Sequence, residues 1–229
     1  MDQMDGINPS LRRAIESLPS PGSPGASTDA EETPEQTAIR LQRDEQRRLR
    51  DAGLPLRFID ATLHGQQPHP KTAAALLSAD PRDSFYLHGP CGTGKTFLAA
   101  GYLRHWRENN RGRIAFVTAP RLFAELRSTY DGQESELQVI ERYSCARLLV
   151  LDDLGSESFK SSDWLADRLY LILGERHDEC RPTVITSNYG LPEMADRVGD
   201  RIVWRISESC GPQGVIEVGG RNLRARGAR

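Results

Sequence analysis

The chain has 229 residues, of which 38% are apolar and 27% charged, enough for one mid-sized globular domain with a tail. Its 30 basic and 32 acidic side chains leave a net charge of −2, which excludes a global field that would draw the protein onto nucleic acid. The longest aliphatic or aromatic run, Leu169–Leu173, has five residues, and the start Met1–Asp5 is acidic, so we expect neither a membrane span of about 20 residues nor a signal peptide. Four cysteines at least 30 residues apart argue against a disulfide framework or a zinc site and are typical of the reducing cytoplasm: Cys91, Cys145, Cys180 and Cys210.

The N-terminal 37 residues predict a disordered acidic tail. Five prolines lie among Gly, Ser and Thr, and seven acidic residues face two arginines, so this stretch cannot bury enough apolar surface to offset its ordering entropy. Residues 34–51 predict an arginine-rich helix with Thr33 as a candidate cap, ended by Gly53 and Pro55. The expected organisation is a tail at 1–37, a helical linker segment at 38–80 and a globular domain at 81–229.

From residue 84 onward, short apolar strands alternate with helical patterns. This alternation predicts a parallel, doubly wound α/β sheet with helices on both faces, because strands covered on both sides are apolar throughout. Strands are expected at 85–88, 114–118, 148–151, 183–186 and 215–218. Helices are expected at 95–107, 120–130, 134–143, 162–175 with Ser162 as its cap, 192–197 and 200–208.

The strongest motif joins the first expected strand to the next helix. It reads Gly89, Pro90, Cys91, Gly92, Thr93, Gly94, Lys95 and Thr96, a full GxxxxGKS/T pattern, with Phe97 next, and these nine residues are the predicted ATP-binding set. The glycines let backbone N–H groups converge on a phosphate at the positive end of a helix. We expect Lys95 to bridge the β- and γ-phosphates and Thr96 to hold Mg²⁺. An ordinary glycine-rich turn would not explain the flanking strand and helix.

Polar residues follow two other expected strands. Asp152 and Asp153 end an apolar strand, and we expect Asp152 to hold Mg²⁺ and Asp153 to act as the general base toward the attacking water. Two acids that only cap the next segment are the alternative. Asn188 follows Thr186 and Ser187 at the end of another strand, where its amide would face the γ-phosphate, or would form a turn before the next glycine.

Two arginines four residues apart, Arg201 and Arg205, share one face of an expected helix. They are either a solvated face or the source of an arginine finger, which stabilises charge on a transferring phosphate.

Together these motifs resemble the DnaC-type helicase loaders and the related IstB-type transposition ATPases of the AAA+ class. The resemblance covers residues 40–229. It includes the phosphate loop, residues 148–155, the sensor residues 186–188 and residues 50–58, which are similar to the family's entry segment ahead of the ATPase core. It implies a P-loop AAA+ fold of the ASCE type. Only 41 residues follow Asn188, too few for the separate C-terminal helical lid of larger relatives.

The resemblance also implies roles for individual residues. Asp153 stands where many relatives have Glu, Arg205 is the finger that reaches a neighbouring subunit, and Arg201 is its companion. The family's closing Asp-x-Arg segment is represented by Asn222 to Arg224, with Asn in place of Asp.

The implied activity is ATP hydrolysis with ATP and Mg²⁺ that loads a replicative DNA helicase, gripped by the N-terminal region, onto single-stranded DNA. Subunits would associate through ATP-bridged interfaces. An IstB-like transposition helper is the nearest alternative; a small-molecule phosphotransferase and a non-hydrolysing adaptor are more distant ones. The expected two-helix insertion places Arg121, Arg127 and Tyr130 as candidate DNA contacts, whereas residues 103–113 are interpreted as surface with Trp106 packed inward.

Overall fold

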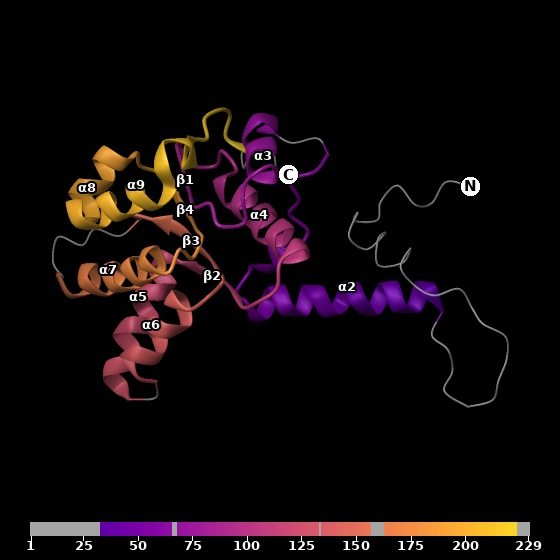
Figure 1. Cartoon of the computed structure of the whole chain (residues 1–229), viewed down its shortest axis with the longest axis horizontal. Helices are drawn as coiled ribbons and strands as arrows, with labels where there is room; N and C mark the ends of the chain where they lie inside the picture. Colours follow the sequence, from indigo (N-terminus) through magenta and orange to yellow (C-terminus); the bar gives the residue numbers. More distant parts are fainter. Residues whose placement is uncertain (1–32, 66–67, 133, 157–162, 224–229) are drawn as a thin grey trace. The chain divides into compact units, whose positions relative to one another are not determined.

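The computed structural model describes residues 33–65, 68–132, 134–156 and 163–223 (Figure 1). The chain divides into two compact units, residues 1–51 and 52–229. The described part of the first is helix α2 (Pro34–Asp51), capped as predicted: Gln36 N–H donates to Thr33 Oγ1 over 3.3 Å, and Thr33 N–H donates to Gln36 Oε1 over 3.0 Å. Residues 1–32 lie outside the described residues, so the acidic tail and its boundary stay predictions.

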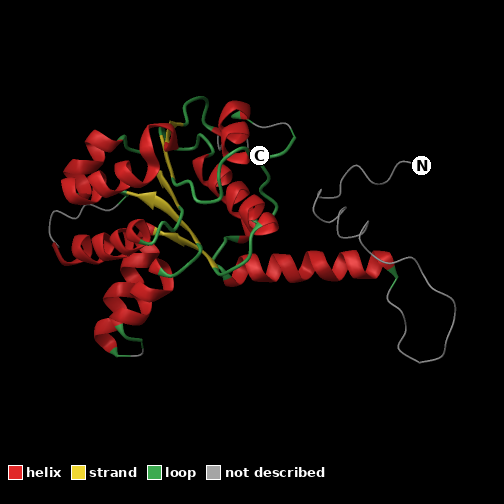
Figure 2. Ribbon diagram, viewed as in Figure 1, coloured by secondary structure: helices red, strands yellow, loops and turns green. Residues whose placement is uncertain are grey.

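The second unit contains a five-stranded sheet in the order β2-β3-β4-β1-β5, and every pairing in it is parallel (Figure 2). The predicted strands are therefore confirmed, and β3 extends three residues further than expected, through both aspartates. The bounds are β1 (Phe85–His88), β2 (Ile114–Thr118), β3 (Leu148–Leu154), β4 (Thr183–Ser187) and β5 (Val215–Glu217).

Two helical layers enclose this sheet (Figures 1 and 2). On one face, α4 packs against β1, β3 and β4, and on the other the buried apolar residues of α5 to α9 form one cluster. Leu149 and Leu151 of β3 belong to that cluster, so Leu148 and Val150 face α4, because side chains alternate along a strand. The helices are α3 (Pro70–Leu77), α4 (Lys95–Asn109), α5 (Ala119–Ser128), α6 (Glu136–Ser144), α7 (Asp163–Asp178), α8 (Leu191–Val198) and α9 (Asp200–Gly214).

The C-terminal part differs in detail from the prediction. Helix α9 continues to Gly214 instead of ending near residue 208, through a break at Gly211 (φ 60°, ψ 178°). Pro212 explains this break, because the residue before a proline is driven out of the helical conformation. After β5 the described chain runs to Leu223 without a helical lid, as expected. The predicted cap Ser162 lies outside the described residues.

A fully buried arginine, Arg176, connects the end of α6 and the loop after it to the start of β4. Arg176 on α7 donates from Nε to Thr183 Oγ1 over 2.8 Å, and its other nitrogens donate to the carbonyl oxygens of Tyr143, Ser144, Ala146 and Pro182. Two of these carbonyls belong to the last residues of α6, which have no partner within the helix. Burial lowers the pKa of Arg176 to about 9, so the guanidinium stays charged at neutral pH.

Candidate nucleotide-binding site

The phosphate loop spans the six residues between the end of β1 at His88 and the start of α4 at Lys95. Gly89 has φ 136°, and a Cβ there would lie 2.5 Å from the carbonyl oxygen of Val218. Gly92 has φ 80°, and its Cβ would lie 2.1 Å from Asn222 Oδ1. Gly89 therefore requires glycine for both conformation and space, and Gly92 requires it for its conformation. The loop leads into the N-terminus of α4, which is a favourable place for a phosphate.

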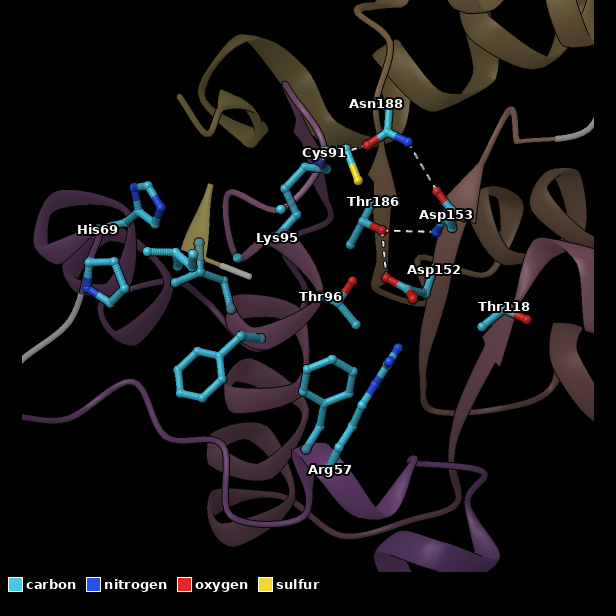
Figure 3. Close-up of a pocket in the computed structure, with 17 residues that line it drawn as sticks. Arg57, His69, Cys91, Lys95, Thr96, Thr118, Asp152, Asp153, Thr186 and Asn188 are labelled. Carbon is cyan, nitrogen blue, oxygen red and sulfur yellow. Dashed lines mark hydrogen bonds between the residues drawn. The ribbon is translucent and has the colours of Figure 1, made fainter. Parts of the chain in front are cut away.

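A cavity of about 510 Å³ opens beside this loop (Figure 3). Six of the nine predicted ATP-binding residues line it: Cys91, Gly92, Gly94, Lys95, Thr96 and Phe97. Gly89, Pro90 and Thr93 do not line the cavity, but they shape the loop, since the Thr93 hydroxyl donates to Pro90 O over 3.0 Å. Asp152, Asp153 and Asn188, which sequence analysis assigned to the same site, also line it.

The Lys95 ammonium group lies at the centre of this site, and its side chain is buried. Nζ donates to Gly89 O over 2.7 Å, to Pro90 O over 2.8 Å and to Asn188 Oδ1 over 3.0 Å. The same Asn188 amide donates from Nδ2 to Asp153 Oδ1 over 3.4 Å. Asn188 thus connects the phosphate-binding lysine to the predicted general base.

Thr186 organises the two aspartates. Its hydroxyl accepts from the Asp153 N–H over 2.9 Å and donates to Asp152 Oδ1 over 2.7 Å (Figure 3). Asp153 has φ 61°, and the pairing of β3 with β4 shifts register between Leu151 and Leu154. This irregularity directs two consecutive aspartates toward one cavity, although neighbouring residues of a regular strand point to opposite faces.

Asp152 is buried, with 5% of its surface exposed. Burial raises the pKa of its carboxyl group above the usual value, as does the nearby Asp153; the hydroxyls of Thr186 and Thr96 and the positive charge of Arg57 act in the opposite direction. The Thr96 hydroxyl and the Asp152 carboxyl group therefore lie next to each other.

This pair fits the requirements of Mg²⁺, which is typically held by one or two protein oxygens together with substrate phosphates. Within the described residues, no group of three or more His, Cys, Asp or Glu side chains forms a self-contained metal site. A metal here would therefore take its remaining ligands from the phosphates of a bound nucleotide and from water.

The two candidate finger residues lie elsewhere. Arg205 donates to Glu208 Oε2 over 3.1 Å and to the Tyr170 hydroxyl over 3.5 Å. The Arg201 guanidinium lies over the Tyr170 ring, 4.4 Å from its centre. Neither lines the cavity of its own subunit. Their action on a neighbouring subunit stays a prediction.

The candidate DNA contacts lie on α5 and the turn after it. Arg121 pairs with Glu125 over 2.9 Å, Arg127 is exposed, and Tyr130 is exposed with its ring centre 5.3 Å from that of Trp164. On α4, Trp106 packs inward as interpreted, and its Nε1 donates to Pro81 O over 2.8 Å.

Several lining residues were not identified from sequence: Arg57, Phe58, Pro68, His69, Leu98, Thr118, Thr186 and Leu223. Arg57, Phe58 and Thr186 belong to residues 50–58 and 186–188, which resemble the family. This resemblance was the sequence signal that could have identified them. His69 Nε2 lies 2.5 Å from Thr93 O, and Leu223 N–H donates to Gly92 O over 2.8 Å. Segments before and after the core thus hold the phosphate loop from outside.

Several known proteins are similar to this chain in sequence or in fold. The profile of the IstB-like ATP binding proteins matches residues 34–221. An ATP-binding protein of an insertion sequence from Mycobacterium tuberculosis is 32% identical over 139 residues, 57% of this chain and 54% of that protein. The replicative helicase loader DnaC of Escherichia coli is 27% identical over 124 residues, 54% of this chain and 49% of DnaC. The chain spans about half the length of these curated relatives.

A crystal structure of the DnaC helicase loader has the same fold, with a TM-score of 0.61 at 24% identity, covering 72% of this chain and 100% of that one. None of the described helices combines the length and apolar character that a membrane crossing requires. The profile match spans most of the residues, and the parallel sheet carries a complete phosphate loop. The chain therefore belongs to the family of IstB-like ATP binding proteins and has the P-loop fold of the AAA+ class.

Proposed function

We propose that this protein is an ATP-dependent loader that places a replicative DNA helicase on single-stranded DNA. The observation that carries the proposal is the Asn188 bridge between Lys95 and Asp153. The Asn188 amide contacts both Lys95, which would bind phosphate, and Asp153, which would activate water. Loss of the γ-phosphate would therefore change the hydrogen bonds of Asn188 at the end of β4. This arrangement suits a nucleotide-dependent switch, and the similarity to a helicase loader supports a helicase as the partner.

The reaction is hydrolysis of the terminal phosphoanhydride bond of ATP. Lys95 and the backbone N–H groups of the loop hold the β- and γ-phosphates, and Asp153 accepts a proton from the attacking water. Thr96 and Asp152 would hold Mg²⁺, which neutralises charge on the phosphates. Asn188 keeps Asp153 oriented and senses when the γ-phosphate has left.

Arg205 would complete the site of a neighbouring subunit. It lies on α9, which leads to the edge strand β5, and it is occupied by Glu208 and Tyr170 in its own subunit. A guanidinium delivered across an interface stabilises charge in the transition state, so hydrolysis would require ATP-bridged self-association.

The partners follow from the same proposal. The N-terminal region would grip the helicase, and single-stranded DNA would contact Arg121, Arg127 and Tyr130 on the insertion between β2 and β3. These three side chains combine two cations with an exposed aromatic ring, which is the composition that binds unpaired bases.

The decisive experiment is capture of the replicative helicase of the same genome with the Asp153→Asn variant, which is designed to retain ATP. We expect a stoichiometric complex that requires ATP and that the wild-type protein releases after hydrolysis. The Lys95→Ala variant is the control, since it should bind no nucleotide and form no such complex. Absence of helicase from the complex, with ATP shown to be bound, would refute the proposal.

A transposition helper is the second candidate, because the insertion-sequence relative is the more similar of the two at 32% identity. The same capture experiment, run with a transposase as the offered partner, separates the two functions. Retention of the transposase in place of the helicase would establish this second function.

A further inference from the structure

Arg57 lies inside the nucleotide cavity without a role assigned by the motifs. It belongs to the 3₁₀ helix η1 (Leu56–Phe58), 32 residues before the phosphate loop begins at Gly89. It lines the cavity, and Figure 3 shows its guanidinium directed toward Thr96 and Asp152. This is the side of the cavity on which the predicted Mg²⁺ ligands lie, so it is the side that would face the β- and γ-phosphates.

The backbone that carries Arg57 is firmly placed. At its start, the N–H of Phe116 on β2 donates to Ala52 O over 2.7 Å. At its end, Arg104 on α4 donates to Ala61 O over 2.8 Å. Between them, Ile59 N–H donates to Leu56 O over 3.0 Å. We call residues 52–61 the lead-in segment; it holds the Arg57 backbone in place while leaving the side chain exposed.

The positive charge of Arg57 suits an anionic ligand. Its guanidinium lines the cavity, and its central carbon lies 4.7 Å from the ring centre of Phe58. No ion pair found among the described residues includes Arg57. A planar guanidinium donates paired hydrogen bonds to phosphate oxygens, which the single point charge of Lys95 cannot do.

We propose that Arg57 is a second phosphate-binding residue, which contacts the γ-phosphate of ATP bound in its own subunit. The contact makes the lead-in segment responsive to the nucleotide, and this segment follows directly on helix α2 in the chain. ATP binding would therefore protect the lead-in segment further against local opening, and loss of the γ-phosphate would remove that protection.

The test uses the full chain, a non-hydrolysable ATP analogue and ADP, with affinities measured by calorimetry. Arg57→Gln should weaken the analogue about tenfold or more and ADP much less, because charge-assisted hydrogen bonds to the γ-phosphate are lost. Arg57→Lys should recover part of the affinity, since it restores charge without the planar fork. Arg82→Gln is the matched control: it removes an exposed arginine of the same unit that pairs with Asp80, outside the cavity, and should change neither affinity.

A second readout separates binding from a merely structural role. The analogue should slow hydrogen exchange of the amides at 56–61 in the wild type and not in Arg57→Gln, whose melting temperature without nucleotide should be unchanged. Unchanged affinity, an equal loss for the analogue and ADP, or equal protection in both proteins would overturn the proposal. The test needs no helicase or transposase, so its failure is distinct from failure of the proposed function.

Discussion

The hydroxyl of Thr186 connects the stability of the fold to the chemistry of the site. It is 1% exposed, donates to Asp152 Oδ1 over 2.7 Å and accepts from the Asp153 N–H over 2.9 Å. Thr186→Val keeps the shape of the side chain and removes both hydrogen bonds. In the variant, the backbone N–H of Asp153, a residue with φ 61°, no longer has the Thr186 hydroxyl as its acceptor. The buried Asp152 carboxyl group loses the same hydroxyl as a donor.

The expected cost can be worked from these two bonds. Leaving one buried polar group without its partner costs about 1–3 kcal/mol, so two such groups would cost about 2–6 kcal/mol. The lower part of this range is expected, because Asp152 keeps the Thr96 hydroxyl as a donor. A domain of this size has about 5–15 kcal/mol of stability, so the variant should still fold. ATP hydrolysis should fall further than ATP binding, because the orientation of Asp153 depends on this hydroxyl.

The cost should depend on pH. Burial already raises the pKa of Asp152, and loss of the Thr186 donor raises it further. An acid whose pKa is raised by folding makes the folded state less stable as the pH climbs from its usual pKa to the raised one. In Thr186→Val the pH range between the usual and the raised pKa of Asp152 is wider. The loss of unfolding free energy relative to the wild type should therefore be larger at neutral pH than at mildly acidic pH.

Urea unfolding of the wild type, Thr186→Val and Thr186→Ser at both pH values measures these effects. Thr186→Ser is the control, since it retains the hydroxyl and should restore most of the stability and the hydrolysis rate. A Thr186→Val protein as stable and as active as the wild type would refute the reasoning, and so would a deficit that grows at acidic pH.

Substitutions at three further positions test the site. Lys95→Ala should abolish most ATP binding in a calorimetric titration, and Lys95→Arg should not restore it because the guanidinium is too bulky for the loop; wild-type affinity in Lys95→Arg would contradict the steric argument. Asp153→Asn should bind ATP nearly normally and hydrolyse it about 10²–10⁴-fold more slowly in a phosphate-release assay; a collapse of binding would instead identify Asp153 as a metal ligand. Arg205→Ala should bind ATP but lose hydrolysis, and mixing it with Asp153→Asn should recover activity, because one mixed interface contains an intact Asp153 and an intact Arg205. No recovery in demonstrably mixed oligomers would exclude action across the interface.

The sequence alone determined the architecture and the centre of the site. Strand bounds could be predicted to within a few residues because buried parallel strands are short, apolar and separated by amphipathic helices. The phosphate loop was identifiable because its chemistry depends on glycines, a lysine and a hydroxyl at fixed local spacing. Asp152, Asp153 and Asn188 could be placed with it, since parallel strands bring their carboxyl ends to one edge of the sheet.

The tertiary structure decided everything that depends on contacts between distant segments. The left-handed conformation of Asp153 comes from the irregular pairing of β3 with β4, and local sequence does not specify that pairing. Burial of Arg176 depends on carbonyl groups at the end of α6, in the loop after α6 and just before β4, which only the folded chain brings together.

Arg57 and Leu223 line the cavity together, although they are 166 residues apart in the chain, near the two ends of the second unit. No periodicity or motif spacing spans such a separation, because side-chain neighbours across that distance are set only when the whole sheet and its helices have packed. The sequence by itself therefore predicted which groups of the phosphate loop would bind phosphate, because their geometry is local. Only the folded structure decided which remote groups, the guanidinium of Arg57 above all, share the cavity with them.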